Sequence, residues 1–291
     1  MGPGVISRQW RLRSRVIDLS RGVIMGVINV TPDSFSDGGV HLDHDVAIAA
    51  GRRMIEEGAA VVDVGGESTR PGSDPVPEDE ELGRVIPVVE ALAGDGIAVS
   101  IDTSKPEVAR AAIEAGAEIV NEVTAAGSEG MIPVLAGLGP GVVLMHMKGT
   151  PRTMQVDPVY QDVVAEVGSF LAERARSLID AGVDAASIAI DPGIGFGKNV
   201  THNLQLIRGL PQLAELGFPV VLGSSRKSFL GTITGIEEPS ARDLVTAVTT
   251  ALGYQHGARV FRVHDVASSR AALRMAAAIV QPEQWDEWSP D

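Results

Sequence analysis

The sequence predicts an α/β protein, a single (β/α)8 TIM barrel with a short N-terminal extension. Eight short apolar runs rich in branched residues alternate with stretches in which apolar residues recur every three or four positions. Several runs end abruptly in polar, charged or glycine-rich residues, as in VSIDTSKP and IAIDPGIGFGK. Because the strands of a parallel barrel deliver their C-terminal ends to one face, that face is expected to carry the functional site.

The apolar runs have the character of strands buried on both faces of a parallel sheet. The predicted strands span residues 23–30, 60–64, 97–101, 119–123, 142–145, 187–190, 220–222 and 260–263. The predicted helices include residues 45–57, 106–115, 160–181, 204–216 and 241–256. Two long connections, 29–43 and 65–77, leave the C-terminal ends of strands, so we expect lids or binding loops there.

A repeated phrase joins helices to strands. EEGAAVVDV, EAGAEIVNE, DAGVDAASIAID and HGARVFRV each place a glycine shortly before the next strand. Glycine suits the left-handed position that ends a helix. The repetition indicates units of one architecture, so residues 1–21 are predicted as an N-terminal extension or hairpin, 22–280 as the barrel and 281–291 as a C-terminal tail.

Composition limits the classes of function. The chain of 291 residues has a formal net charge of −14 at pH 7, which argues against extended contact with nucleic acid. It has no cysteine, which excludes disulfides, thiolate chemistry and cysteine-based metal sites. No apolar run approaches the roughly 18 residues of a membrane span, so neither a membrane nor a nucleic acid is an expected partner, and the cytoplasm is the default location.

The N-terminal segment is basic, with five arginines before Gly22. A nucleic-acid-binding arm and a short hairpin beside the barrel are both compatible with this pattern. The structural interpretation is preferred.

Two carboxylates, Asp102 and Asp191, each close an apolar run and are expected to point into the mouth of the barrel. A buried carboxylate needs a partner rich in N–H groups, such as a guanidine or the edge of an amino-pyrimidine ring. The alternative is that either one caps the following helix. Asn29 and Asn121 stand at equivalent strand ends, which favours a shared site over two caps.

A glycine-rich stretch, DPGIGFGKN, follows Asp191. Its spacing fits neither the P-loop nor the dinucleotide-binding fingerprint, although it remains compatible with a phosphate cradle. The preferred interpretation is that the glycines let Phe196 and Lys198 line a pocket at close approach. His146 closes the run 142–145 and is compatible with several roles.

Basic groups gather after the last two predicted strands, where TIM barrels commonly bind phosphate. The residues concerned are Ser225, Arg226, Lys227, Ser228, Arg262 and His264. Lysine snorkelling from the core and simple pairing of Arg262 with an acid are the alternatives. Oxygen-bearing side chains at the first two strand ends suit magnesium rather than zinc, and these are Asp33, Ser34, Glu67, Ser68 and Thr69.

Seven motifs occur in a fixed order: NVTPDSFSDGG, GGESTRPG, IDTSKP, LMHMKGTPRTMQ, DPGIGFGKN, SRKSF and RVHDV. In this combination the chain resembles the dihydropteroate synthase family, folate-pathway enzymes that join a pterin pyrophosphate to p-aminobenzoate. The resemblance runs from about Val23 to about Val266, nearly the whole chain. It implies a reaction in which pyrophosphate leaves the pterin methylene carbon and the arylamine nitrogen attacks it, with Mg²⁺ helping the leaving group.

The resemblance also implies roles for individual residues. It places the pterin among Asp102, Asn121, Asp191, Lys227, Met145 and Gly223. It places the pyrophosphate on Asn29, Arg262 and His264, with Asn29 acting through the metal. It forms the p-aminobenzoate pocket from Thr69, Arg70, Pro71, Phe196, Lys227 and Ser228. The implied catalytic groups are Asp102, which faces the developing positive charge, Lys227 and Asp33, which supports the cation or its ordering.

One departure from the family pattern is the acid after Asn121. The family usually reads Asn-Asp-Val here, whereas this chain has Glu122. We expect Glu122 to brace neighbouring groups rather than to contact the pterin. A pterin-binding methyltransferase that uses a corrinoid acceptor and a non-catalytic pterin-binding paralogue are the rival functions, and the intact loop motifs favour the synthase. The resemblance further implies a homodimer, with helix 241–256 as the contact.

Overall fold

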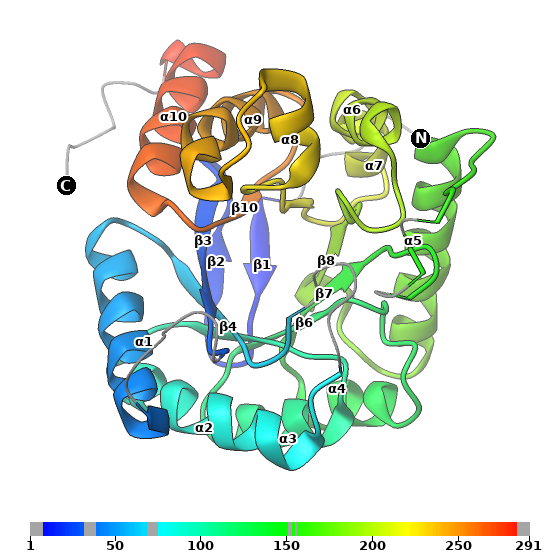
Figure 1. Ribbon diagram of the computed structural model, residues 1–291. Coiled ribbons are helices and arrows are strands. Elements are labelled where there is room, and N and C mark those ends of the chain that lie inside the picture. Colours follow the sequence, from blue (N-terminus) through cyan, green and yellow to red (C-terminus); the bar gives the residue numbers. More distant parts are fainter. Residues whose placement is uncertain (1–7, 32–38, 69–74, 151–152, 155, 284–291) are drawn as a thin grey trace.

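The structure, a computed structural model, describes residues 8–31, 39–68, 75–150, 153–154 and 156–283. An eight-stranded parallel sheet forms a barrel with helices around it (Figure 1). The strand order is β8-β7-β6-β5-β4-β3-β10-β9, and a bridge between Ile190 and Val220 joins the two ends of the sheet. The predicted TIM-barrel fold is therefore confirmed.

The barrel strands lie close to the predicted runs. They are β3 (Val23–Asn29), β4 (Val61–Gly65), β5 (Val99–Asp102), β6 (Ile119–Glu122), β7 (Gly141–Met145), β8 (Ile188–Asp191), β9 (Val221–Leu222) and β10 (Val260–Val263). Their outward side chains pack under the helices in one large hydrophobic cluster, and their inward side chains fill the barrel.

The helices differ from the prediction in detail. They are α1 (Gly39–Glu56), α2 (Glu78–Gly94), α3 (Pro106–Glu114), α4 (Met131–Leu138), α5 (Val163–Asp180), α6 (Val200–Arg208), α7 (Leu210–Ala214), α8 (Ser228–Thr234), α9 (Asp243–Gln255) and α10 (Val266–Val280). The helix predicted over 204–216 is two helices, because Gly209 and Pro211 interrupt it. Helix α5 starts later than predicted, because the Asp162 carboxylate caps it.

The repeated glycine phrase has one backbone conformation. Gly58, Gly116, Gly182 and Gly257 have φ angles of 100°, 111°, 100° and 102°. Each follows a helix and precedes a strand, as expected for a residue whose left-handed backbone conformation ends an α-helix. A side chain at these positions would strain the turn.

The N-terminal segment forms a hairpin, β1 (Gln9–Arg11) and β2 (Val16–Asp18). Trp10 is fully buried and its indole Nε1 donates to the carbonyl of Ser187 at 2.8 Å. The Trp10 ring packs with inward residues of the barrel strands, so the hairpin closes the N-terminal end of the barrel interior.

The basic residues of this segment bind the protein itself. Arg11 pairs with Asp184, Arg13 donates to a main-chain carbonyl, and Arg15 pairs with Glu118. These contacts support the structural interpretation of the segment. No helix in the described part of the chain is long and apolar enough to cross a membrane.

Side chains alternate between the barrel interior and the helix layer along each strand. Asn29 of β3 pairs in register with Gly65 of β4, Gly65 with Asp102 of β5, and Asp102 with Asn121 of β6. These four strand ends therefore lie at one level at the C-terminal mouth. Glu122, one residue beyond Asn121, faces the helix layer.

Candidate active site

The mouth of the barrel holds a buried ion-pair network around Arg262. Its Nε donates to Oδ2 of Asp63 at 2.6 Å, and its Nη2 donates to Oδ2 of Asp102 at 2.6 Å. The side-chain amide of Asn121 donates to the same Asp63 oxygen at 3.2 Å. Three strands and β10 thus contribute to one polar cluster, and pairing of Arg262 with acids, one of the alternatives, is what the structure contains.

Asp63 is the residue of this cluster that sequence reasoning missed. It lies inside the apolar run VVDVG, which reads as an ordinary buried strand. The signal that reveals it is spacing, because Asp63 stands two residues before Gly65 and therefore faces the interior as Gly65 does. A fully buried carboxylate in mid-strand requires a cationic partner, and Arg262 supplies it.

Neither predicted carboxylate is a helix cap. Lys105 occupies the N-cap of α3, and Asn199 caps α6 with its side chain. Asp191 instead accepts the main-chain N–H of Gly193 at 2.6 Å. The helix-cap alternative for Asp102 and Asp191 is therefore wrong.

Burial controls the ionisation of the cluster. Burial raises the pKa of Asp102 to about 7, although the nearby Arg262 opposes the shift. For Arg262, burial acts to lower the pKa, but Asp63 and Asp102 outweigh it and the pKa is raised. Arg262 therefore stays charged, whereas Asp102 changes charge near neutral pH.

Lys227 and Asp191 meet beside this cluster. Burial lowers the pKa of Lys227 to about 8 and raises the pKa of Asp191, and each partner's charge opposes the other's shift. A Cβ added at Gly223 would lie 3.5 Å from Oδ2 of Asp191, 3.9 Å from Cβ of Arg262 and 4.0 Å from Nζ of Lys227. Gly223 thus stands at the point where the three side chains converge.

The glycine-rich stretch shapes the wall next to Lys227. Lys227 donates to the carbonyl of Ile194, and its Nζ lies 4.5 Å from the ring centroid of Phe196. Gly193 has φ +67°, and a Cβ there would come within 1.8 Å of the carbonyl oxygen of His146. Only glycine permits this approach, so Gly193 lets the stretch pack against the end of β7.

Lys198 is held by contacts with neighbouring groups of the protein. Its side chain is buried, and its Nζ lies 2.9 Å from Nδ1 of His146, 2.9 Å from the carbonyl oxygen of Phe196 and 3.3 Å from that of His146. Burial lowers the pKa of Lys198 to about 7 and that of His146 to about 3. Lys198 ties the end of β7 to the glycine-rich stretch.

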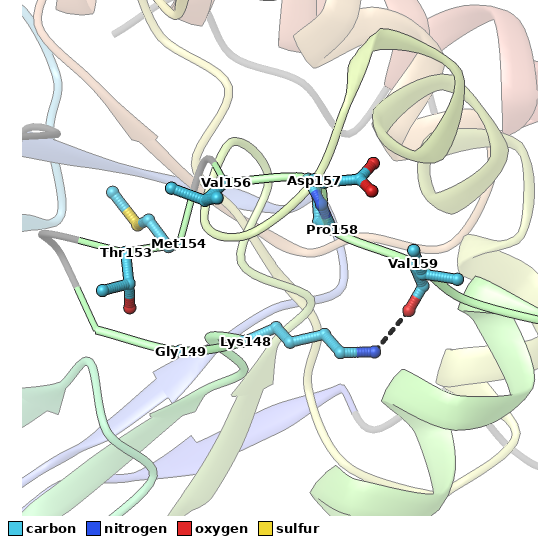
Figure 2. A pocket seen from close by; sticks show the side chains of 8 residues that line it. All are labelled: Lys148, Gly149, Thr153, Met154, Val156, Asp157, Pro158 and Val159. Atoms are coloured by element: carbon cyan, nitrogen blue, oxygen red, sulfur yellow. Dashed lines mark hydrogen bonds between the residues drawn. The ribbon is translucent and has the colours of Figure 1, made fainter.

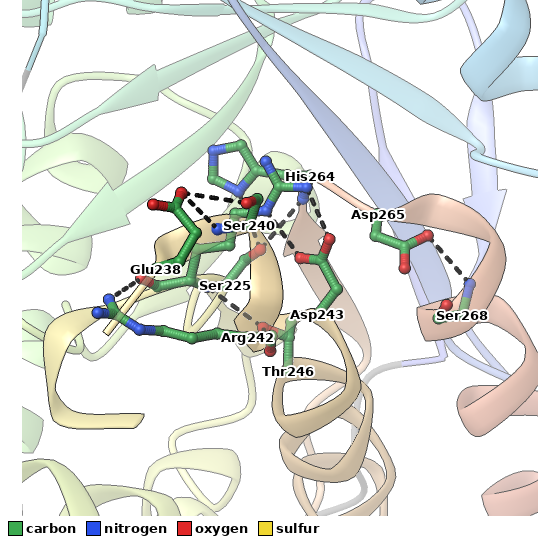
Figure 3. A network of polar contacts seen from close by, with 10 residues as sticks. Ser225, Glu238, Ser240, Arg242, Asp243, Thr246, His264, Asp265 and Ser268 are labelled. Atoms are coloured by element: carbon green, nitrogen blue, oxygen red, sulfur yellow. Dashed lines mark hydrogen bonds and ion pairs between the residues drawn. The ribbon is translucent and has the colours of Figure 1, made fainter. Parts of the chain in front are cut away.

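The predicted group of cations divides in two. Ser225 Oγ lies 2.9 Å from Nδ1 of His264 and accepts the main-chain N–H of His264 at 3.2 Å (Figure 3). Arg226 instead binds both carboxylate oxygens of Asp243 on α9, with distances of 2.7 Å. Arg226 is therefore not part of a cation cluster. The mouth of the barrel keeps Lys227, Arg262 and His264.

Of the other predicted residues, Asn29 and Met145 lie at the ends of β3 and β7. Ser228 is exposed at the start of α8. Asp33, Thr69, Arg70 and Pro71 lie outside the described residues. Within the described part of the chain, no group of three or more His, Asp or Glu side chains could hold a metal ion.

Glu122 is buried under the helix layer. Its carboxylate accepts the hydroxyl of Thr124 at 2.6 Å, the N–H of Thr124 at 3.1 Å and the N–H of Ala126. Arg174 of α5 donates to the carbonyls of Ala125 and Ala126, both at 2.7 Å. Burial raises the pKa of Glu122, although these hydrogen bonds oppose it. The contacts agree with a bracing role.

Figure 2 shows a pocket of about 260 Å³ in the chain that follows β7. Its lining residues are Lys148, Gly149, Thr153, Met154, Val156, Asp157, Pro158 and Val159. The ammonium of Lys148 donates to the carbonyl of Val159 and lies 4.1 Å from the ring centroid of Tyr160. None of the predicted site residues lines this pocket.

Comparison with known proteins places this site in context. A family model described as pterin binding enzyme matches residues 25–264. The dihydropteroate synthase of Mycobacterium leprae is 47% identical over 263 residues, which cover 88% of this chain and 92% of the relative.

Solved structures are similar over a comparable length. Xanthomonas albilineans dihydropteroate synthase with 4-aminobenzoic acid has a TM-score of 0.89 and 47% identity, and the match covers 94% of this chain and 98% of that one. The enzyme of the same organism in complex with 7,8-dihydropteroate has a TM-score of 0.86 and 45% identity, with the same coverage.

Proposed function

The chain belongs to the dihydropteroate synthase family, and on that premise we propose how its residues carry out the reaction of that family. The enzyme is a transferase of folate biosynthesis. It condenses 6-hydroxymethyl-7,8-dihydropterin pyrophosphate with p-aminobenzoate to give 7,8-dihydropteroate and pyrophosphate. The observation that carries the division of roles is the convergence of Asp102, Asn121, Asp191, Lys227 and Arg262 from separate strand ends at one mouth.

The pterin ring fits the end of the mouth that combines acceptors with a donor. Asp102 and Asp191 accept N–H groups of the amino-pyrimidine edge, and Asn121 and Lys227 donate to its ring nitrogen and carbonyl oxygen. Met145 and Gly223 line the slot. Burial, which lowers the pKa of Lys227, has already removed most water from its ammonium. Little further solvation is therefore lost when this ammonium donates to the pterin.

The pyrophosphate belongs to the side of Asn29, Arg262 and His264. Arg262 can hold a phosphate oxygen through the same Nη2 that donates to Asp102 in the free protein. Substrate binding therefore exchanges one partner of Arg262 for another. Its Nε remains on Asp63, which keeps the guanidinium in place during the exchange.

The chemical step breaks the bond between the methylene carbon and the pyrophosphate oxygen, whose electron pair leaves with pyrophosphate. Positive charge then develops on the pterin methylene, and the Asp102 carboxylate stabilises it. The neutral amine nitrogen of p-aminobenzoate forms the new bond and loses its proton to solvent. Because the arylamine is a competent nucleophile, geometry rather than a strong base provides most of the rate.

Mg²⁺ fits the donor set of this side of the mouth. It prefers oxygen ligands and usually keeps several waters together with one or two protein groups and substrate phosphates. The side-chain oxygen of Asn29, half-buried at the end of β3, is such a group, and Asp33 would support it. When bound, the ion neutralises charge on the leaving pyrophosphate.

The arylamine pocket adjoins the cation–π contact between Lys227 and Phe196. Ser228 at the start of α8 belongs to it, and Thr69, Arg70 and Pro71 complete it in this proposal. Phe196 provides an apolar face for the ring of p-aminobenzoate, while the positive charge of the nearby basic residues attracts the carboxylate of this substrate.

A homodimer through α9 and α10 is also part of the proposal. These helices pack against each other, and α9 exposes Leu244, Val248 and Leu252 at four-residue spacing. Their exposed fractions are 75%, 50% and 45%, and α10 adds Met275 and Ile279. An apolar face of this kind marks an interaction surface, and a second copy fits the family. A cytoplasmic location, expected from the sequence, completes the proposal.

The direct test is an assay of both products. Purified protein would be incubated with 6-hydroxymethyl-7,8-dihydropterin pyrophosphate, p-aminobenzoate and Mg²⁺, and pyrophosphate release and dihydropteroate formation would be followed together. Equal amounts of both products are expected, and Asp102→Asn should remove most turnover. Tight pterin binding without turnover would contradict the proposal and favour a binding paralogue, which methyl transfer to a corrinoid acceptor would separate from a methyltransferase.

A further inference from the structure

Arg226 has an unusual backbone at a crowded position. Its φ angle is +59°, in the left-handed region that side chains other than glycine rarely adopt. A residue keeps such a conformation only when its surroundings determine it, and such residues cluster at functional sites. Arg226 separates Ser225, the partner of His264, from Lys227.

The contacts that hold this backbone all come from one direction. Both carboxylate oxygens of Asp243 bind the guanidinium at 2.7 Å. The main-chain N–H of Arg226 donates to Oγ1 of Thr246 at 3.2 Å, and its carbonyl accepts from Nη1 of Arg242 at 2.9 Å. Figure 3 shows Arg242, Asp243 and Thr246 together at the start of α9. Side chain, donor and acceptor of one residue are thus all fixed by one helix end.

The neighbouring residues point the other way. Ser225 contacts His264 by two hydrogen bonds, and Lys227 reaches the carbonyl of Ile194 and lies close to Asp191. Ser224, one residue further, shares a hydrogen bond of 2.7 Å with Thr249 of α9. Ser225 and Lys227 thus contact groups of the mouth, while Arg226, the left-handed residue between them, contacts α9.

We propose that Arg226 is a positioning residue for the reaction. Its left-handed backbone, clamped by Asp243, Thr246 and Arg242, brings Ser225 with His264 and Lys227 into the mouth at the same time. This inference rests on the proposed roles of Lys227 and His264. It assigns no contact with substrate to Arg226 itself.

The test compares two truncations of Arg226 that differ only in backbone freedom. Arg226→Ala and Arg226→Gly both remove the ion pair, but glycine adopts φ +59° without the steric cost of a Cβ. Arg226→Ala is expected to lower kcat/KM for the pterin pyrophosphate at least tenfold, mainly through kcat. Arg226→Gly is expected to regain at least threefold over alanine. A glycine variant no better than alanine would overturn the role of the backbone.

A second readout does not depend on turnover. Binding of inorganic pyrophosphate, measured by calorimetry, reports on His264 and is expected to weaken several-fold in Arg226→Ala. A wild-type protein that binds pyrophosphate without making dihydropteroate would contradict the proposed function and still test this inference. Unchanged pyrophosphate affinity together with unchanged kcat/KM in Arg226→Ala would overturn the inference, even if stability fell.

Controls separate positioning from folding. Arg52→Ala removes an arginine from another ion pair, with Asp95 at 2.8 Å, and should leave kcat/KM within twofold of wild type. Circular dichroism and thermal unfolding would verify the fold of each variant. If Arg226→Ala does not fold, Asp243→Asn, which keeps the shape of the carboxylate, takes its place. If Asp243→Asn kept the kcat/KM of the wild type, the proposal that Asp243 holds Arg226 in position would be overturned.

Discussion

Arg262 and Asp102 face each other across the barrel mouth, with Nη2 of the arginine 2.6 Å from Oδ2 of the aspartate. The two residues have different proposed tasks, one on the pyrophosphate and the other on the pterin. In the free protein they neutralise each other, so substrate binding replaces an internal ion pair instead of filling two separate subsites.

Asp63 should govern this exchange because it holds Arg262 by Nε. Asp63→Asn keeps the shape but removes the charge that orients the guanidinium. We expect a loss of about tenfold in kcat/KM for the pterin pyrophosphate, a size seen when a supporting contact is removed. Steady-state kinetics would measure it. Glu118→Gln, a buried carboxylate bound by Ser14 and Arg15 near the N-terminal hairpin, is the control and should not change this parameter. Tighter pyrophosphate binding in Asp63→Asn would contradict the anchoring role.

The pH range over which kcat/KM is high should be narrow. Asp102, with a pKa of about 7, must be ionised to stabilise positive charge, so activity falls as pH drops below 7. Lys227, with a pKa of about 8, must be protonated to donate, so activity also falls as pH rises above 8. The kcat/KM profile of the free enzyme reports both limbs as properties of the coupled cluster. In Lys227→Arg the alkaline limb should disappear from whatever activity remains. A flat profile from pH 6 to 9 would refute these assignments.

Glu122→Asp should affect stability more than pterin binding. The shorter carboxylate withdraws from the N–H groups of Thr124 and Ala126, and leaving such groups unpaired costs about 1–3 kcal/mol. Denaturant unfolding would measure the loss, and the Michaelis constant for the pterin should stay within twofold. If that constant instead dropped several-fold, Glu122 would have to act on the pterin itself.

Lys198→Met should loosen the wall of the arylamine pocket. Methionine fills similar space but donates nothing to the carbonyls of His146 and Phe196. We expect a loss of about 3 kcal/mol in the free energy of unfolding, from the hydrogen bonds of Nζ to these two carbonyls and to Nδ1 of His146, and a raised Michaelis constant for p-aminobenzoate. A Michaelis constant for the pterin pyrophosphate that rose equally would mean that the effect is not confined to this wall.

Leu244→Glu tests the proposed dimer face. Leu244 is 75% exposed, so in a monomer the substitution should leave stability nearly unchanged. In a dimer it would place charge in an apolar interface, and light scattering after size-exclusion chromatography should report half the wild-type mass. Ile233→Glu, at a 52% exposed position of α8, is a matched control. A wild-type protein that is already monomeric would contradict the homodimer.

The sequence was sufficient for the barrel because short branched runs, helical periodicity and glycine helix ends all indicate the same repeating unit. It also brought Asp102, Asn121 and Asp191 to the same mouth, since the C-terminal ends of parallel strands share a face of the barrel. Asp63 escaped because an acid inside an apolar run is informative only once the inward register is known. Arg226 was wrongly assigned to the cation cluster because the direction of its side chain depends on a positive φ angle. A positive φ angle can be expected from the sequence at a glycine but not at an arginine.

The hairpin at the N-terminus has a consequence for how the protein forms. Trp10 is made early in synthesis, yet the carbonyl that its indole binds belongs to Ser187, 177 residues later. The hydroxyl of Tyr254 likewise reaches back 234 residues to the carbonyl of Ser20. Contacts so distant along the chain form slowly, because the intervening chain must first be ordered. Burial of Trp10 therefore waits for the second half of the barrel, and the fluorescence of Trp10 in a variant with Trp285 and Trp288 replaced would time that step.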